Sequence, residues 1–171
     1  ICSLAWGIGM GITAVVARRT GEKDPAGASS AAMQSVLLIL VLGVLIAIPG
    51  MIYAERILGL MGAEEAVVSE GTSYMRWMLG GNTVILLLFG VNAIFRGGGN
   101  PMMALWSLWL ANGINIVLDP LLIFGWGPIP AMGVTGAAIA TNIGRGAGVL
   151  LQFYYLFRVG ERITLRGAKV R

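Results

Sequence analysis

Long apolar segments separated by short polar stretches dominate the pattern along this chain. There are five of them, over residues 1–17, 32–54, 74–95, 102–124 and 134–157. Four reach the ~20 residues that a helix needs to cross a ~30 Å hydrocarbon core, and the first is shorter. Apolar runs of this length with helical spacing are not strands. The pattern predicts an all-α polytopic transmembrane helix bundle with about five spans, without a second domain in residues 1–171.

The stretches between these segments carry capping and turn signals. Residues 18–25 end one helix with cations and Gly21, and they begin the next with an Asp24 cap and Pro25 at its first position. Both features suit the unpaired amides and the dipole of a helix start. Three further stretches are expected to be loops: the acidic residues 62–70, the glycine turn 96–101 and the uncharged residues 125–130.

Composition agrees with a membrane protein. Of the 171 residues, 57% are hydrophobic and 12% are charged, whereas a soluble domain is about one quarter charged. The chain has no histidine and one cysteine, Cys2, so neither an intramolecular disulfide nor a Cys/His metal site can form. Ile1 begins directly in an apolar run, and we therefore expect a chain that starts inside a helix rather than a signal peptide.

The basic residues predict how the bundle is oriented. If residues 18–25 lie inside, that side holds Arg18, Arg19, Lys23, Arg96, Arg158, Arg162, Arg166, Lys169 and Arg171. The outer side then holds only Arg56 and Arg76. The positive-inside rule thus places the tail 158–171 in the cytoplasm. Because this orientation explains the net charge of +4, we expect the lipid bilayer, and no nucleic acid, as a partner.

One apolar segment carries a polar stripe. Asn112, Asn115 and Asp119 are spaced i, i+3 and i+7, so they share one face of a helix. A carboxylate within a membrane span is costly and usually faces the bundle interior or a watery cavity. Pro120 has no amide hydrogen, so the carbonyl of Ile116 loses its helical donor and a kink is expected.

Depth in the membrane brings further polar groups to this stripe. Asp119 lies about five residues, ~8 Å, below the outer end of its helix, and Thr141 about seven residues, ~10 Å, below that surface on the next helix. We expect the two side chains to lie at one level on neighbouring helices. Asn82 falls near that level, and Asn92 lies deeper, toward the cytoplasmic end. Carboxylate, amide, hydroxyl and freed carbonyl oxygens suit a proton or a hard cation such as Na⁺.

Other interpretations stay open for the same residues. Asn112 and Asn82 can simply bond to neighbouring helices, contributing roughly 0.6 kcal/mol each. Arg145, one turn beyond Thr141, can pair with Asp119, and the pair would then be structural.

Glycine spacing predicts where helices approach closely. Gly7 and Gly11 are four residues apart, and so are Gly144 and Gly148. Such pairs of small residues let two helix backbones pack together.

The residue inventory excludes the common enzyme sites. No Ser or Cys has a base beside it, and the acids at membrane depth reduce to Asp119. No P-loop is present, so nucleotide-driven transport is not encoded in these residues. We expect a protein that is not an enzyme and holds no cofactor.

Four motifs give the chain a family resemblance. They are RRTGEKD at 18–24, FRGGGN at 95–100, NIVLDPLLIFG at 115–125 and GVTGAAIAT at 133–141. In this order they resemble the multidrug and toxic compound extrusion (MATE) transporters. The resemblance implies a twelve-helix protein of two six-helix lobes, of which this chain is the second to sixth helix of the N-terminal lobe. The first helix and the C-terminal lobe would then be its partners. Pro101 directly follows Asn100, so this turn is shorter than the family's usual pattern.

The resemblance also implies a mechanism. It predicts a secondary active antiporter for multidrug efflux that exports drugs or toxic organic cations in exchange for H⁺ or Na⁺ by alternating access. The expected location is the cytoplasmic (inner) membrane of a prokaryote. Asn115, Asp119 and Thr141 would form the cation-coupling site, which in many members includes a first-helix acid that this chain lacks. Further candidates for the substrate cavity or a gate are Asn112, Asn82, Asn92, Pro120 and Arg145.

Two alternative functions remain. One is a lipid-linked saccharide flippase of the same superfamily, which an arginine-rich cavity would favour, although only Arg145 lies at membrane depth. The other is a structural membrane subunit without transport activity, in which Asp119 would be shielded.

Overall fold

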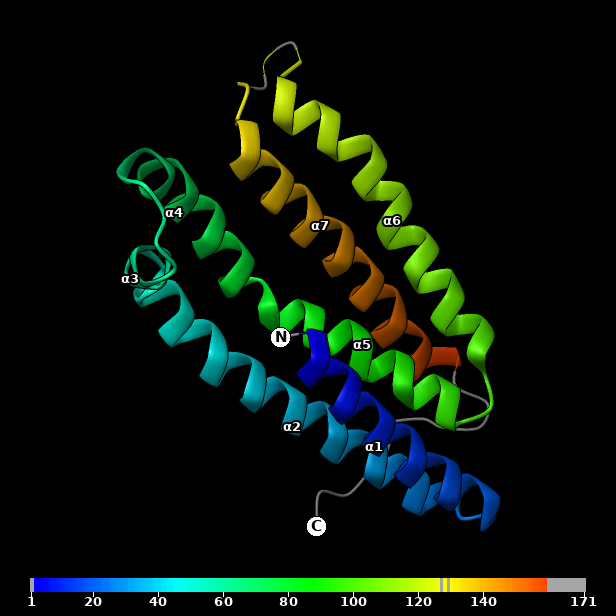
Figure 1. Cartoon of the computed structure of the whole chain (residues 1–171). Coiled ribbons are helices and arrows are strands. Elements are labelled where there is room, and N and C mark those ends of the chain that lie inside the picture. Colours follow the sequence, from blue (N-terminus) through cyan, green and yellow to red (C-terminus); the bar gives the residue numbers. More distant parts are fainter. Residues whose placement is uncertain (1, 127, 129, 160–171) are drawn as a thin grey trace.

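The computed structural model describes residues 2–126, 128 and 130–159 of the chain. These residues form long helices that lie side by side in one bundle, and no β-strand occurs among them (Figure 1). The helices are α1 (Cys2–Gly21), α2 (Pro25–Ile52), α3 (Ala54–Leu60), α4 (Glu65–Gly80), α5 (Asn82–Gly97), α6 (Pro101–Phe124) and α7 (Gly133–Tyr154). A short π-helical turn, Tyr155–Val159, continues α7. The predicted all-α class is confirmed.

Three stretches of the described residues are long and apolar enough to cross a membrane. They are Pro25–Ile52, Val67–Gly97 and Pro101–Phe124. The other two predicted spans correspond to α1 and α7, which pack against α5 and α6 respectively. Most of the predicted cytoplasmic tail, residues 160–171, lies outside the described part of the chain.

The predicted span 74–95 differs from the structure. The helix begins earlier, at Glu65, and it is interrupted where Gly80 and Gly81 separate α4 from α5. A methyl group at Gly80 would lie 2.6 Å from the sulfur of Met51 on α2, and one at Gly81 would overlap the amide of Asn142 on α7. Gly80 and Gly81 therefore lie against α2 and α7, which leave no room for a larger side chain at either position.

The start of α2 agrees with the sequence prediction, whereas α4 begins earlier than predicted. The carboxylate of Asp24 accepts a hydrogen bond from the Gly27 amide at 2.8 Å, with Pro25 as the first residue of α2. This confirms the cap predicted there. The acidic stretch 62–70 is not a loop as expected, because α4 already begins at Glu65 and continues through it. An acidic residue in a first turn is favourable beside the helix dipole.

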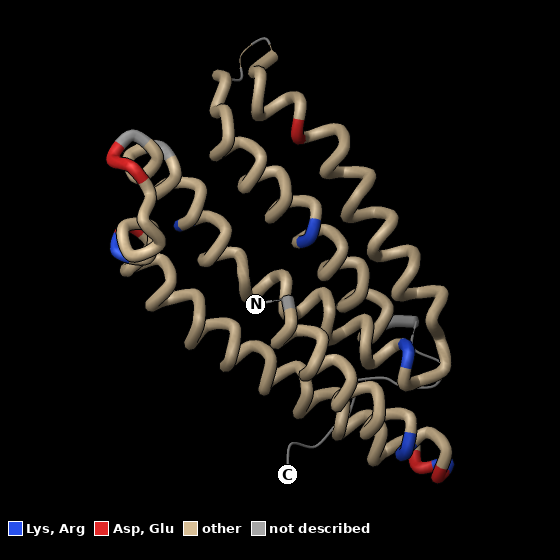
Figure 2. The backbone as a smooth tube through the Cα atoms, in the orientation of Figure 1, with Lys and Arg blue, Asp and Glu red and all other residues tan. Residues whose placement is uncertain are grey.

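The core and the charges divide the bundle into regions. Buried apolar side chains of α1, α2 and α5 pack into one cluster that includes Val16, Ile39 and Val91. Charged residues gather toward the two ends of the bundle, while the long middle stretches of α6 and α7 carry one acid and one base (Figure 2). These two are Asp119 and Arg145.

Glycines let α7 lie directly on the backbone of α6. A methyl group at Gly136 would lie 2.4 Å from the Leu122 carbonyl oxygen, one at Gly144 would lie 2.6 Å from that of Ala111, and one at Gly148 would lie 3.0 Å from that of Ser107. The predicted close packing at Gly144 and Gly148 is confirmed. It is not seen for Gly7 and Gly11, since within the described part of the chain no neighbouring atom comes within 4 Å of a methyl group placed at either.

Candidate functional site

Two of the predicted site residues meet on one face of α6. Asn115 and Asp119 are four residues apart in a continuous helix, so their side chains lie one above the other. The Asn115 amide nitrogen donates to the Asp119 carboxylate at 3.2 Å. Both side chains are half-buried. A charged acceptor strengthens such a bond, which holds the carboxylate in a fixed orientation.

A third predicted residue reaches the same cluster from α7. The Asn115 amide also donates to the Thr141 hydroxyl at 3.3 Å, and that hydroxyl donates to the Ala137 carbonyl at 2.8 Å. Gly144, one turn further along α7, allows this approach, since a methyl group there would lie 2.6 Å from the Ala111 carbonyl oxygen of α6. Asp119 and Thr141 thus lie at one level on neighbouring helices, with Asn115 between them.

The cluster offers oxygen atoms of three kinds. The Asp119 carboxylate, the Asn115 amide and the Thr141 hydroxyl are hard ligands of the type that Na⁺ accepts, and the carboxylate can also hold a proton. Among the described residues no group of three or more His, Cys, Asp or Glu side chains is placed to hold a metal ion. The described residues therefore offer an ion one carboxylate and neutral oxygens. The assignment as a coupling site stays a prediction.

Pro120 follows the cluster within α6. The helix continues through it to Phe124, so the proline does not end the span. Because proline has no amide hydrogen, the Ile116 carbonyl lacks its usual helical donor. That oxygen belongs to the residue after Asn115, which makes it a further candidate ligand.

Arg145 does not pair with Asp119 in this structure. The ion pairs between described side chains are all in the first loop, where Arg18 and Arg19 meet Glu22 and Arg19 also approaches Asp24. Neither of the two charged groups at membrane depth appears among them. The structural interpretation of Asp119 as an Arg145 partner is therefore not supported.

The three remaining asparagines occupy different surroundings. Asn112 is exposed on α6, outside the hydrogen-bonded cluster. Asn82 is fully buried at the start of α5, and neither atom of its amide group has a hydrogen-bond partner. Its predicted alternative role, as a plain interhelical bond, is therefore not seen. Asn92 is buried further along α5, toward its C-terminal end.

Asn92 belongs to a second polar cluster that the sequence reasoning did not find. The Gln152 amide of α7 donates to the Asn92 side-chain oxygen at 2.7 Å and to the Ser107 hydroxyl of α6 at 3.0 Å. Ser107 donates to the same Asn92 oxygen at 3.1 Å. All three residues are at most 1% exposed. The only signal was the spacing of two of them: Gln152 lies four residues after the buried Gly148 of α7, and Ser107 lies four residues before the buried Ala111 of α6.

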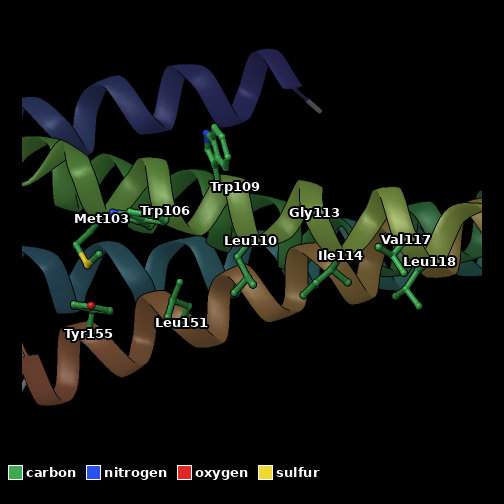
Figure 3. A pocket seen from close by; sticks show the side chains of 10 residues that line it. All are labelled: Met103, Trp106, Trp109, Leu110, Gly113, Ile114, Val117, Leu118, Leu151 and Tyr155. Carbon is green, nitrogen blue, oxygen red and sulfur yellow. The ribbon is translucent and has the colours of Figure 1, made fainter.

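An apolar groove runs along α6 and α7, apart from both polar clusters. It is open, has a volume of about 810 Å³ and is lined by side chains that include Met103, Trp106, Trp109, Ile114, Leu151 and Tyr155 (Figure 3). None of the predicted site residues lines it. The hydrogen-bonded cluster of Asn115, Asp119 and Thr141 is therefore distinct from this groove.

Comparisons with known proteins agree with one another. A family model described as MatE matches residues 1–121. The chain is 35% identical to a protein of Shewanella oneidensis named "FAD transporter", over 98% of this chain and 37% of that protein. A solved inward-facing multidrug resistance MATE family transporter of the MOP superfamily shows a TM-score of 0.87 and 36% identity, over 98% of this chain and 38% of the other. The outward-facing conformation of such a transporter also gives a TM-score of 0.87, with 35% identity, over 99% of this chain and 38% of the other. The chain spans about a third of the length of the curated relatives it matches.

Proposed function

The chain belongs to the MatE family of multidrug and toxic compound extrusion transporters, and on that premise we propose that its protein is a secondary active antiporter. This family consists of membrane transporters rather than enzymes, which agrees with the absence of an enzyme site expected from the sequence. The proposed protein exports drugs or other small amphipathic compounds, organic cations included, in exchange for H⁺ or Na⁺. It resides in the inner membrane of a prokaryote, and this chain supplies the second to sixth helix of its N-terminal lobe.

One observation carries the proposal: Asn115 links Asp119 on α6 to Thr141 on α7 at membrane depth. An ionised carboxylate within a membrane is costly unless a proton or a cation neutralises it. The described residues supply no basic partner for Asp119, and the groups that do surround it are oxygen-rich. Such a site favours occupation by H⁺ or Na⁺ taken from the outer side, where the predicted orientation places it.

The shared donor suggests how occupation changes the protein. The Asn115 amide donates to Asp119 and Thr141 at similar distances, 3.2 and 3.3 Å. Protonation or Na⁺ binding neutralises Asp119 and so weakens the charge-assisted bond to it. The hydrogen bond from the Asn115 amide to Thr141 then becomes the stronger of the two, which alters the contact between α6 and α7. The Ile116 carbonyl freed by Pro120 is available to coordinate Na⁺ in this state.

The helices themselves need not deform much during the cycle. The chain resembles the inward-facing and the outward-facing transporter equally well, with a TM-score of 0.87 to each. This supports alternating access by movement of this helix group as a unit against the rest of the protein. A small change at Asp119 would then act on its contacts with elements outside this chain.

The test is an export assay in cells that carry the full-length protein. We expect Asp119→Asn to abolish ethidium export while the protein remains at normal levels in the membrane. The reason is that the amide of the new side chain neither carries a charge nor takes up a proton at physiological pH. Glu64→Gln is the matched control, since Glu64 is an exposed carboxylate that directly precedes α4 and makes no side-chain cap hydrogen bond, and it should export normally. Normal export by the Asp119 variant would contradict the proposal.

A further inference from the structure

Arg145 lies on the face of α7 that is turned toward the other helices. Its position is i+3 from Asn142 and i−7 from Gln152, so the three share one helix face. Asn142 donates to the Trp77 carbonyl of α4 at 2.8 Å, and Gln152 donates to the Leu88 carbonyl of α5 at 3.3 Å. The side of α7 that carries Leu150 is exposed instead, at 72% for that residue. The Arg145 side chain therefore extends from the face of α7 that is turned toward the interior of the bundle.

This cation has no counter-ion among the described side chains. It is half-buried, and none of the ion pairs between described residues includes it. The hydrogen bonds found for its neighbours on the same face do not involve it either. A charged side chain at membrane depth is rare because it is costly, and it normally faces a partner or a pathway. A negative partner of Arg145 would therefore come from outside the described residues.

We propose that Arg145 binds the anionic group, carboxylate or phosphate, of an amphipathic ligand. This inference rests on the proposed transport function and adds compounds that carry a negative group to its cargo. The planar guanidinium presents its N–H donors as a fork that matches both kinds of anion. The oxygen cluster at Thr141 begins one turn, about 5 Å along the axis, closer to the outer surface. A cation and an anionic group can thus be held at neighbouring levels on the same pair of helices.

Equilibrium binding to the purified full-length protein tests the assignment. The probes are fluorescein, which carries a carboxylate, and rhodamine 123, a cation of the same ring system in which that carboxyl group is a methyl ester. The dissociation constant is read from fluorescence anisotropy. We expect Arg145→Gln to weaken fluorescein binding about 30-fold, as for loss of one partner of a partly buried charge pair. Rhodamine 123 binding should change less than about threefold, because that cation has no anionic group for Arg145 to bind.

Two further variants separate binding from folding. Arg145→Lys keeps the charge but loses the fork, so fluorescein should bind about three- to tenfold more weakly than to the wild type. Arg76→Gln removes one charge from an exposed side chain of α4 and should change neither dye. Wild-type affinity for fluorescein in the Lys or Gln variant would overturn the proposal. An equal loss of both dyes in the Gln and Lys variants would also overturn it, because Arg145 would then be structural.

The source of the anionic group is distinguished by the lipid around the protein. In nanodiscs of phosphatidylglycerol, an anionic lipid at Arg145 would compete with fluorescein and weaken its binding relative to phosphatidylcholine. A soluble cargo would leave the two affinities equal, and either result is compatible with an anion at Arg145. Binding is measured without an ion gradient, so a failure of cation exchange at Asp119 would leave this result unaffected.

Discussion

At the scale of single residues, the site depends on one amide that serves two acceptors. Asn115 is the member of the cluster that contacts both Asp119 and Thr141, and it does so across two helices. Removing it leaves the carboxylate without that donor and separates the α6 oxygens from the α7 hydroxyl. Loss of an orienting partner at an ion site typically lowers affinity by about 10- to 100-fold.

We therefore expect Asn115→Ala to raise the Na⁺ or H⁺ concentration that gives half-maximal export by about 10-fold or more. The measurement is the rate of ethidium export by the full-length protein at increasing Na⁺ or H⁺ concentration. Asn100→Ala, at an exposed asparagine that directly precedes α6 and makes no side-chain cap hydrogen bond, should keep the wild-type dependence. An unchanged ion dependence in the Asn115 variant would show that this amide is not part of the site.

Much of this residue-scale picture was predictable, for reasons of spacing. The i, i+4 relation of Asn115 and Asp119 and the matched depth of Thr141 follow from helix geometry once orientation is inferred from charge. The contact of Gln152 with Asn92 and Ser107 was not predictable, since it depends on the rotation of three helices about their axes. Ser107 and Gln152 are also ordinary residues that no motif singles out.

At the scale of helices, the pairing of α6 with α7 rests on backbone contact. Gly136, Gly144 and Gly148 each leave space that the α6 backbone fills. The four-residue glycine spacing predicted this for Gly144 and Gly148 but not for Gly136, and the same spacing at Gly7 and Gly11 has no close neighbour in the described part of the chain. Glycine spacing indicates where two helices can pack closely. Whether they do so depends on where the neighbouring helix lies, which the spacing does not give. The interruption at Gly80 and Gly81 was missed because glycine is frequent within membrane helices.

Gly144→Ala should destabilise the protein by about 1–3 kcal/mol, the range found for overpacking. The added methyl group would lie 2.6 Å from the Ala111 carbonyl oxygen, which is backbone and cannot rotate away. Gly146→Ala is the matched control two residues away, because nothing lies within 4 Å of its added methyl group. Thermal unfolding of the two purified variants makes the comparison. Equal unfolding temperatures would mean that α6 and α7 are not in backbone contact.

At the scale of the whole molecule, the chain covers only part of the length of its relatives. It matches about a third of the length of its curated relatives. Several large apolar side chains of α6 are exposed, among them Trp109 at 71% and Ile116 at 73%. Lipid or the remaining helices of the full-length protein would cover such surfaces. The charge pattern adds a prediction about orientation that covers every helix at once.

Single cysteines in a cysteine-free background of the full-length protein test that orientation. A cysteine at Met61, between α3 and α4, should react with a membrane-impermeant maleimide in intact cells, because this loop is predicted outside. A cysteine at Asn100, between α5 and α6, should react only after permeabilisation. Both positions are exposed in the structure. The reverse labelling pattern would contradict the positive-inside assignment and the outward position of Asp119.

The most direct test of the account is to record ion flux in proteoliposomes that contain the full-length protein. Ethidium supplied on the side from which it is exported should drive a counterflow of H⁺ or Na⁺ through the wild type, followed with a pH-sensitive dye and radioactive Na⁺. With Asp119→Asn, we predict that ethidium still binds but drives no counterflow, because the group that takes up the ion is gone. Wild-type counterflow through that variant would show that the coupling ion does not use Asp119.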